Sequence, residues 1–183
     1  DAKDFDDAIS IRKLDAGDPR HSAPPLAALR AHEASRTKPP QAAALNERGG
    51  AQWELCIHIA DVSHFVKLDS ALDTEARARG NSAYLPRKVV PMLPEVLSNG
   101  ICSLQPDVPR LTRTIWITYD EAGKPTGSRF ARTLIRSAHR LTYIEAQALI
   151  DGRPDLARPH ARYDGPYTDQ LIDTLKLMNE LAV

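Results

Sequence analysis

The chain has 183 residues, of which 42% are hydrophobic, which suits one folded domain with a buried core and excludes a disordered tail or a fibrous repeat. Basic and acidic residues each number 24, so a polybasic coat for nucleic acid is excluded as a general property. No apolar run approaches the roughly 20 residues of a membrane-spanning helix, no secretory pattern opens the chain, and two cysteines cannot form a disulfide framework. We therefore expect a cytoplasmic protein with no membrane contact.

Alternating apolar residues predict strands that pair into a mainly antiparallel sheet, the last two joined by a turn at Gly123-Lys124-Pro125. The predicted strands are Ala8–Leu14, Trp53–Ala60, Arg113–Tyr119 and Arg129–Arg136. Residues 15–50, between the first two predicted strands, are rich in alanine, proline, arginine and glycine. Such a composition predicts a long flexible insertion.

Capping signals predict helices on the flanks of the sheet, so the expected fold class is α+β. The predicted helices are 69–79 (ended by Gly80), 94–98, 142–152 (opened by a capping box at Thr142 and Glu145) and 168–183. Residues 84–94 carry three prolines and are expected to run extended. Because an acidic motif opens the chain and the last helix has no cap, we expect a partial domain, 1–183, of a larger protein.

Charge is unevenly distributed along the chain. Residues 1–7 contain four aspartates and one lysine, whereas residues 77–140 contain eleven basic and four acidic residues, an excess of seven positive charges. Nine of those eleven are arginines, which suit bidentate contacts with phosphate. This pattern favours a metal-dependent enzyme acting on a polyanion, with ordinary solvated arginines as the alternative.

The acidic motif Asp1-Ala2-Lys3-Asp4-Phe5-Asp6-Asp7 stands directly ahead of the first strand. In an extended segment Asp4 and Asp6 project to the same side, and carboxylates that close repel one another unless a hard cation lies between them. Oxygen ligands of this kind suit Mg²⁺ or Mn²⁺. An EF-hand is excluded because the sixth residue from Asp4 is Ile9 and not glycine, while a solvated acidic turn stays open as an alternative.

Three blocks carry a family resemblance: DAKDFDDAIS at 1–10, HIADVSHFV at 58–66 and YLPRKVVPMLPEVLSNGICSLQPDVPRL at 84–111. In that order they resemble the catalytic (RNB) domain of the ribonuclease II/ribonuclease R family. The resemblance continues through LTYIEAQALIDG at 141–152 and departs at about 13–51, where a short turn would be expected.

The resemblance implies a hydrolytic 3′-to-5′ exoribonuclease that degrades single-stranded RNA to 5′-nucleoside monophosphates with Mg²⁺ or Mn²⁺. Three of the family's four essential aspartates match Asp4, Asp6 and Asp7 as metal ligands, and the first falls three residues before Asp1. Asp6 matches the residue nearest the attacking water and is the predicted catalytic residue. Tyr84 matches a tyrosine that packs on the 3′-terminal base, a contact that is indifferent to sequence.

Other residues receive more modest predictions. Asp61 stands at a strand end and is expected to bind substrate or to support the residues that do. His58 is expected to be structural, and Cys56 and Cys102 to be buried thiols rather than ligands. No glycine-rich phosphate loop is present, so no nucleotide cofactor is expected, and the sequence indicates no protein partner.

Two other functions compete with catalysis. A non-catalytic RNA-binding module, either a pseudo-enzyme or an inactive truncated fragment, would retain the basic tract and Tyr84. A small metal-binding structural domain would retain only the acids. Three aspartates placed to face phosphates favour the enzyme.

Overall fold

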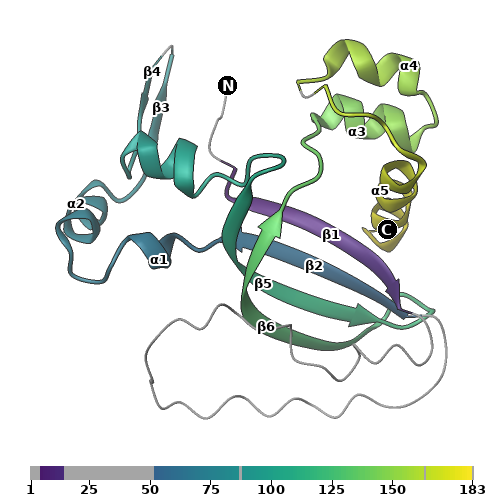
Figure 1. The fold of residues 1–183 in the computed structure, drawn as a ribbon, viewed down its shortest axis with the longest axis horizontal. Coiled ribbons are helices and arrows are strands. Elements are labelled where there is room, and N and C mark those ends of the chain that lie inside the picture. Colours follow the sequence, from purple (N-terminus) through teal and green to yellow (C-terminus); the bar gives the residue numbers. More distant parts are fainter. Residues whose placement is uncertain (1–4, 15–51, 87, 163, 183) are drawn as a thin grey trace. The chain divides into compact units, whose positions relative to one another are not determined.

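The computed structural model describes residues 5–14, 52–86, 88–162 and 164–182 (Figure 1). The predicted insertion at 15–50 and the predicted ligand Asp4 lie outside the described residues. The chain divides into two compact units, which we describe separately. Unit 1 comprises residues 1–8, 58–114 and 132–137, and unit 2 comprises residues 9–57, 115–131 and 138–183.

All four predicted strands are present in one sheet with the order β1-β2-β5-β6. Their bounds are β1 Asp7–Leu14, β2 Gln52–Ala60, β5 Pro109–Tyr119 and β6 Pro125–Arg136. β5 and β6 are antiparallel neighbours joined by the predicted turn, in which the Asp120 N–H donates to the Lys124 carbonyl at 3.0 Å. Gly123 adopts φ of 74° there, a conformation that glycine takes without strain. The α+β class with an antiparallel sheet is confirmed.

Unit 1 adds short elements between β2 and β5: α1 Val62–Phe65, α2 Ala71–Arg79, β3 Ala83–Leu85, β4 Lys88–Val90 and a π-helix Val96–Ile101. Helix α2 begins after Ser70, whose hydroxyl accepts the Asp73 N–H, and ends at Gly80, as predicted. The stretch predicted to run extended forms a hairpin, in which β3 pairs antiparallel with β4.

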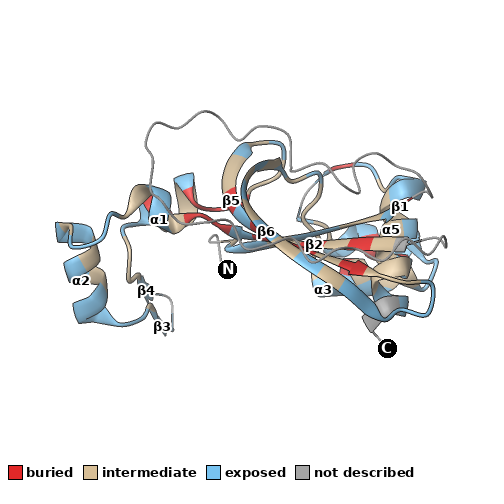
Figure 2. Cartoon of the chain, turned by 90° about the horizontal axis from the view of Figure 1, so that it is seen from below, coloured by how far each residue is buried: buried red, intermediate tan, exposed pale blue. Residues whose placement is uncertain are grey.

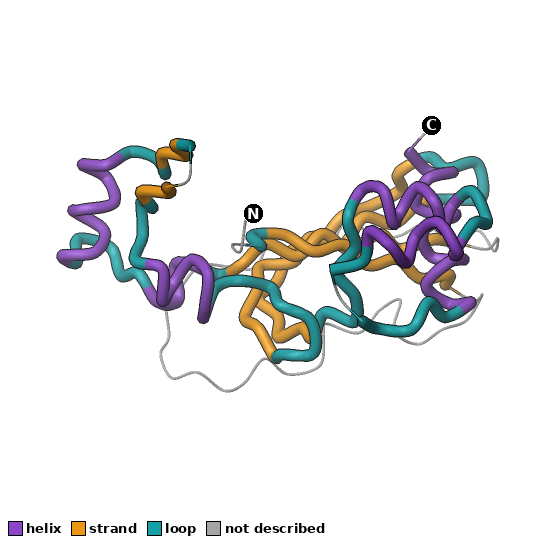
Figure 3. Tube along the Cα trace, turned by 90° about the horizontal axis from the view of Figure 1, so that it is seen from above, coloured by secondary structure: helices purple, strands orange, loops and turns teal. Residues whose placement is uncertain are grey.

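Unit 2 contains the helical segments α3 Tyr143–Ile150, α4 Pro154–Ala157, the 3₁₀ turn Arg158–His160 and α5 Asp169–Ala182 (Figure 3). The predicted capping box is confirmed: the Thr142 hydroxyl accepts the Glu145 N–H at 3.2 Å, and the Glu145 carboxylate accepts the Thr142 N–H at 2.7 Å. Glu145 is fully buried and also accepts the Tyr167 hydroxyl. None of the helices in the described ranges has the length and apolar character needed to cross a membrane.

The buried residues of β2 and β5 are unusually polar. Figure 2 shows buried residues in red. The buried residues of these two strands are Glu54, Cys56, His58 and Ala60 on β2 and Thr112, Thr114, Trp116 and Thr118 on β5. Several large apolar residues are exposed instead, among them Ile59 on β2 and Phe130 on β6, at 47% and 75%. The buried polar groups must therefore satisfy one another by hydrogen bonds.

His58 is structural, as its place on β2 suggested. Its Nδ1 lies 2.8 Å from the hydroxyl of Thr114, which contacts Thr133, and Thr133 in turn lies 2.6 Å from Thr112. Burial lowers the pKa of His58, because the charged imidazolium would lose its hydration. The native protein therefore holds a neutral imidazole.

This burial predicts a specific pH dependence of stability. The unfolded chain protonates His58 near its ordinary pKa of 6.5, whereas the folded chain does so only at lower pH. Stability is therefore full above 6.5 and falls as the pH drops from there to the folded pKa. We expect His58→Gln to flatten this part of the profile, measured as the melting temperature by circular dichroism on both sides of pH 6.5. Equal slopes in the two proteins would contradict the assignment.

Candidate active site

The acidic segment ahead of β1 is fixed through its backbone. The Phe5 N–H donates to the Ser103 hydroxyl at 3.2 Å, and the Phe5 carbonyl accepts the Leu104 N–H at 2.9 Å. The Asp6 carbonyl accepts the Ala60 N–H at 2.8 Å. The side chains of Asp6 and of Asp7, the next residue, are exposed. Two carboxylates therefore extend from a backbone that is tied to the end of β2 and to the segment after the π-helix.

Arg110 stabilises the segment after the π-helix, to which the acidic segment is bound at Ser103 and Leu104. Its Nε donates to the Ser103 carbonyl at 2.8 Å, and its Nη2 donates to the Gly100 carbonyl at 3.2 Å. Ser103 is completely buried, and its neighbours Cys102 and Leu104 belong to the apolar cluster of unit 1, against which Phe5 packs. An arginine that the charge pattern assigned to a polyanion thus holds the turn on which the acidic segment rests.

Cys102 lies within electrostatic reach of the acidic residues. Burial is the main cause that raises the pKa of its thiol, and the charges of Asp6 and Asp61 raise it further against the opposing charge of Arg110. The thiol is therefore protonated at neutral pH.

Asp61 follows β2 directly and is 3% exposed. Its Oδ1 accepts the Ser63 hydroxyl at 2.6 Å and Nε of Arg113 at 3.0 Å, and its Oδ2 lies 3.3 Å from Nε of Arg132. Burial alone would raise the pKa of Asp61, but the hydrogen bonds from Ser63 and Arg113 and the two arginine charges outweigh it and lower the pKa. Asp61 is thus ionised and enclosed, with Ser63, Arg113 and Arg132 as its partners.

The structure brings Asp6 and Asp61 together, because the Ala60 N–H that binds the Asp6 carbonyl belongs to the residue before Asp61. Tyr84 lies on a different sheet, in β3 opposite Val89 of β4. Its side chain is 63% exposed, so among the described residues it is not the core aromatic of the alternative interpretation. An exposed ring on a short hairpin can present its face to a base.

The donors of the predicted metal site are only partly described. Within the described ranges, no group of three histidine, cysteine, aspartate or glutamate side chains is close enough to hold a metal ion. Asp6 and Asp7 supply exposed carboxylates on a fixed backbone, and the third predicted ligand, Asp4, is not described. An oxygen-only donor set that leaves room for water fits a hard divalent cation such as Mg²⁺.

Most of the arginine tract is engaged within the protein. Within the described ranges, these arginines of the tract have ion-pair or hydrogen-bond partners in the protein: Arg77, Arg79, Arg110, Arg113, Arg129 and Arg132. Arg129, for example, binds Glu54 at 2.9 Å and lies 4.0 Å above the ring of Trp116. The excess of positive charge in residues 77–140 therefore overstates the positive charge that is available to bind a polyanion.

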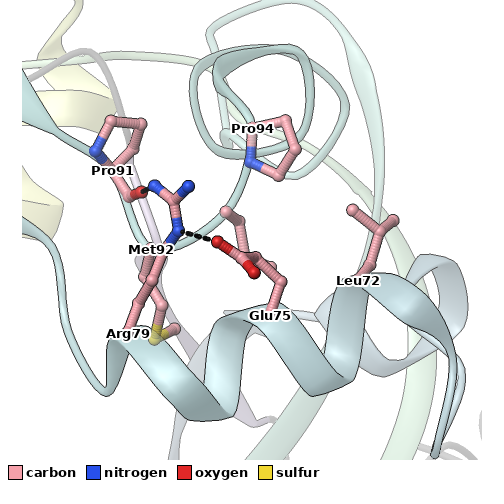
Figure 4. Close-up of a pocket in the computed structure, with 7 residues that line it drawn as sticks. Leu72, Glu75, Arg79, Pro91, Met92 and Pro94 are labelled. Atoms are coloured by element: carbon pink, nitrogen blue, oxygen red, sulfur yellow. Dashed lines mark hydrogen bonds and ion pairs between the residues drawn. The ribbon is translucent and has the colours of Figure 1, made fainter.

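A small hollow between α2 and the segment after β4 does not serve as a ligand site (Figure 4). Its volume is about 110 Å³, below the roughly 300 Å³ at which small-molecule pockets begin. Arg79 crosses it, donating to Glu75 at 2.9 Å and to the Pro91 carbonyl at 3.0 Å. The bond to Pro91 joins α2 to the residue that directly follows β4 of the hairpin that carries Tyr84.

A model of the RNB domain matches residues 1–183. The chain belongs to the RNB family. It is 40% identical over 156 residues to ribonuclease R of Acidithiobacillus ferrooxidans, covering 85% of this chain and 28% of that protein. Its fold matches Mycoplasma genitalium RNase R in complex with double-stranded RNA, with a TM-score of 0.66, 26% identity and coverage of 99% of this chain and 24% of that one.

The fold of this chain is also similar to that of a protein described as a pseudonuclease. Yeast Ssd1, described as a pseudonuclease, matches 75% of this chain and 15% of its own with a TM-score of 0.53 and 22% identity. The chain spans less than a third of the length of ribonuclease R from A. ferrooxidans. Membership of the RNB family therefore identifies the domain. Nuclease activity has to be argued from the residues that are present.

The pairing of Arg113 and Arg132 with Asp61 was not predicted from the sequence. These partners lie on β5 and β6, far from Asp61 in sequence. Both arginines lie within their strands, and β5 is the neighbour of both β2 and β6 in the sheet, so the pairing could be inferred only once the strand order was known.

Proposed function

We propose that the protein is a metal-dependent 3′-to-5′ exoribonuclease that hydrolyses single-stranded RNA to 5′-nucleoside monophosphates. The observation that carries this proposal is the pair of exposed carboxylates, Asp6 and Asp7, on a backbone held by the end of β2 and by the buried Ser103, in a chain of the RNB family. The similarity to ribonuclease R proteins supports RNA as the substrate.

In this proposal Asp4, Asp6 and Asp7 hold Mg²⁺ or Mn²⁺. The bound ion supplies Lewis acidity toward the scissile phosphate and lowers the pKa of water. The chain itself positions the reacting groups. Hydrogen bonds of the Phe5 and Asp6 backbone fix the segment from which the carboxylates extend, which favours a reproducible arrangement of the phosphate. Asp6 is the residue we assign to the attacking water, and Tyr84 the one we assign to the terminal base. No nucleotide cofactor is required for hydrolysis of a phosphodiester.

A time course on 5′-labelled single-stranded RNA tests the proposal. We expect progressive shortening from the 3′ end with Mg²⁺ or Mn²⁺, release of 5′-monophosphates, and no reaction in excess EDTA, because the carboxylates alone cannot stabilise the charge that develops on the phosphate. Degradation that persists in EDTA, or products that end in a 3′-phosphate, would refute the proposed chemistry.

The same experiment distinguishes the alternative of a non-catalytic RNA-binding module. That alternative predicts RNA binding without shortening at any concentration of Mg²⁺ or Mn²⁺. The retained acidic segment argues against it, because exposed carboxylates near phosphates weaken binding unless a cation neutralises them. As part of the same proposal we place the protein in the cytoplasm, where buried free thiols such as Cys56 and Cys102 stay reduced.

A further inference from the structure

One buried carboxylate anchors two exposed arginines. The side chains of Arg113 and Arg132 are 53% and 60% exposed, whereas that of Asp61 is 3% exposed. Arg113 directs Nε to Asp61 and Nη2 to the Ser63 hydroxyl at 3.0 Å, and Arg132 directs Nε to Asp61. Within the described ranges, Nη1 of Arg113 and both Nη groups of Arg132 have no further hydrogen-bond partner. The cluster carries one net positive charge.

A second cluster in the protein also consists of one buried carboxylate and two arginines. It shows that the fold can neutralise a buried acid with arginines that are less exposed than those on Asp61. Glu54 also binds two arginines, Arg12 at 2.5 Å and Arg129 at 2.9 Å. There two guanidinium nitrogens, Arg12 Nε and Arg129 Nη1, are buried without a hydrogen-bond partner among the described residues, and Arg129 stacks on Trp116. The Arg12 and Arg129 side chains are 39% and 37% exposed, against 53% and 60% for the two arginines on Asp61, so the Asp61 cluster presents more of its arginine surface to solvent.

We propose that Arg113 and Arg132 form a binding site for backbone phosphates of RNA, with Asp61 as the residue that orients both guanidinium groups. The inference rests on the proposed function and adds a substrate contact to it. A planar guanidinium offers paired N–H donors to phosphate oxygens, and a side chain already held in place loses less entropy on binding. The site lies at the end of β2 that also binds the Asp6 carbonyl, so an RNA held there lies beside the acidic segment.

The test is RNA binding as a function of salt, measured by fluorescence anisotropy with a labelled uridine oligonucleotide in EDTA so that no turnover occurs. Removing both arginines alone would leave Asp61 buried and unpaired, so the variant is the triple substitution Asp61→Asn, Arg113→Gln, Arg132→Gln. The matched control is Arg77→Gln, which removes an arginine of similar exposure, 62%, paired with Asp73 on α2. Both proteins differ from the unmodified one by the same net charge.

We expect the slope of log Kd against log salt to decrease by about 1.4 in the triple variant, because each phosphate contact to a single strand contributes about 0.7. Its Kd should rise about tenfold at low salt, while Arg77→Gln leaves the slope unchanged.

Melting curves by circular dichroism verify that both variants are folded. If the triple variant is not folded, Arg132→Gln alone should lower the slope by about 0.7. Slopes equal to that of the control overturn the site but leave the exonuclease proposal intact, whereas an unmodified protein that binds no RNA overturns both.

Discussion

Replacing Asp6 by asparagine is expected to abolish turnover and to leave RNA binding largely intact. The Asp6 side chain is exposed, and the hydrogen bond to the Ala60 N–H uses the Asp6 backbone carbonyl, which asparagine retains. Loss of one charge at a metal site removes several kcal/mol of transition-state stabilisation, which corresponds to a decrease in rate of at least about a hundredfold. Phosphate contacts elsewhere persist, so the Kd for RNA should change by less than about threefold.

Asp69→Asn is the matched control for this prediction. Asp69 is an exposed aspartate of the same unit, and its φ of 60° is one that asparagine adopts readily. The control should retain both turnover and affinity. Initial rates on labelled RNA and Kd values in EDTA are measured for the three proteins. If Asp6→Asn lowers affinity as much as rate, Asp6 contributes to substrate binding generally and not to the chemical step.

The local features of the fold were predictable because their signals are local. Alternation of apolar residues located all four strands of the sheet, and Thr142 with Glu145 marked the start of α3 three residues apart. Gly80 and Gly123 marked the ends of α2 and β5 because both need positive φ. Strand starts were less certain: β5 and β6 each begin four residues earlier than predicted, at Pro109 and Pro125, where no apolar alternation marks the pairing.

Features that depend on distant partners were not predictable from one sequence. Alternation on β2 separates Trp53 from Glu54 but does not say which face is buried, and in the structure the Glu54 face is. The short helix expected from Pro94 is a π-helix that extends to Ile101, where Arg110 binds the Gly100 carbonyl. The acidic motif could be recognised by resemblance, but its ties to Ala60 and Ser103 depend on contacts across the fold.

Tyr84→Ala is expected to lengthen the final undigested oligonucleotide far more than it slows the initial rate on long RNA. The ring is 63% exposed, so its loss removes little packing. A stack on one base contributes about 1–3 kcal/mol. A long RNA retains many phosphate contacts and is affected little, whereas a strand of a few nucleotides has lost most of those contacts and depends on the stack to keep its last phosphate in place.

Two further variants separate stacking from a packing role in the hairpin. Tyr84→Phe keeps the ring face and should be nearly silent. Val89→Ala removes the cross-strand neighbour of Tyr84 in β4 and leaves the ring itself present. A gel time course on one labelled RNA compares the end products of the four proteins. If the stack matters, only Tyr84→Ala stops at a longer product; if Val89→Ala stops there too, the hairpin's integrity and not the ring sets the final length, because both variants share only the loss of a cross-strand contact.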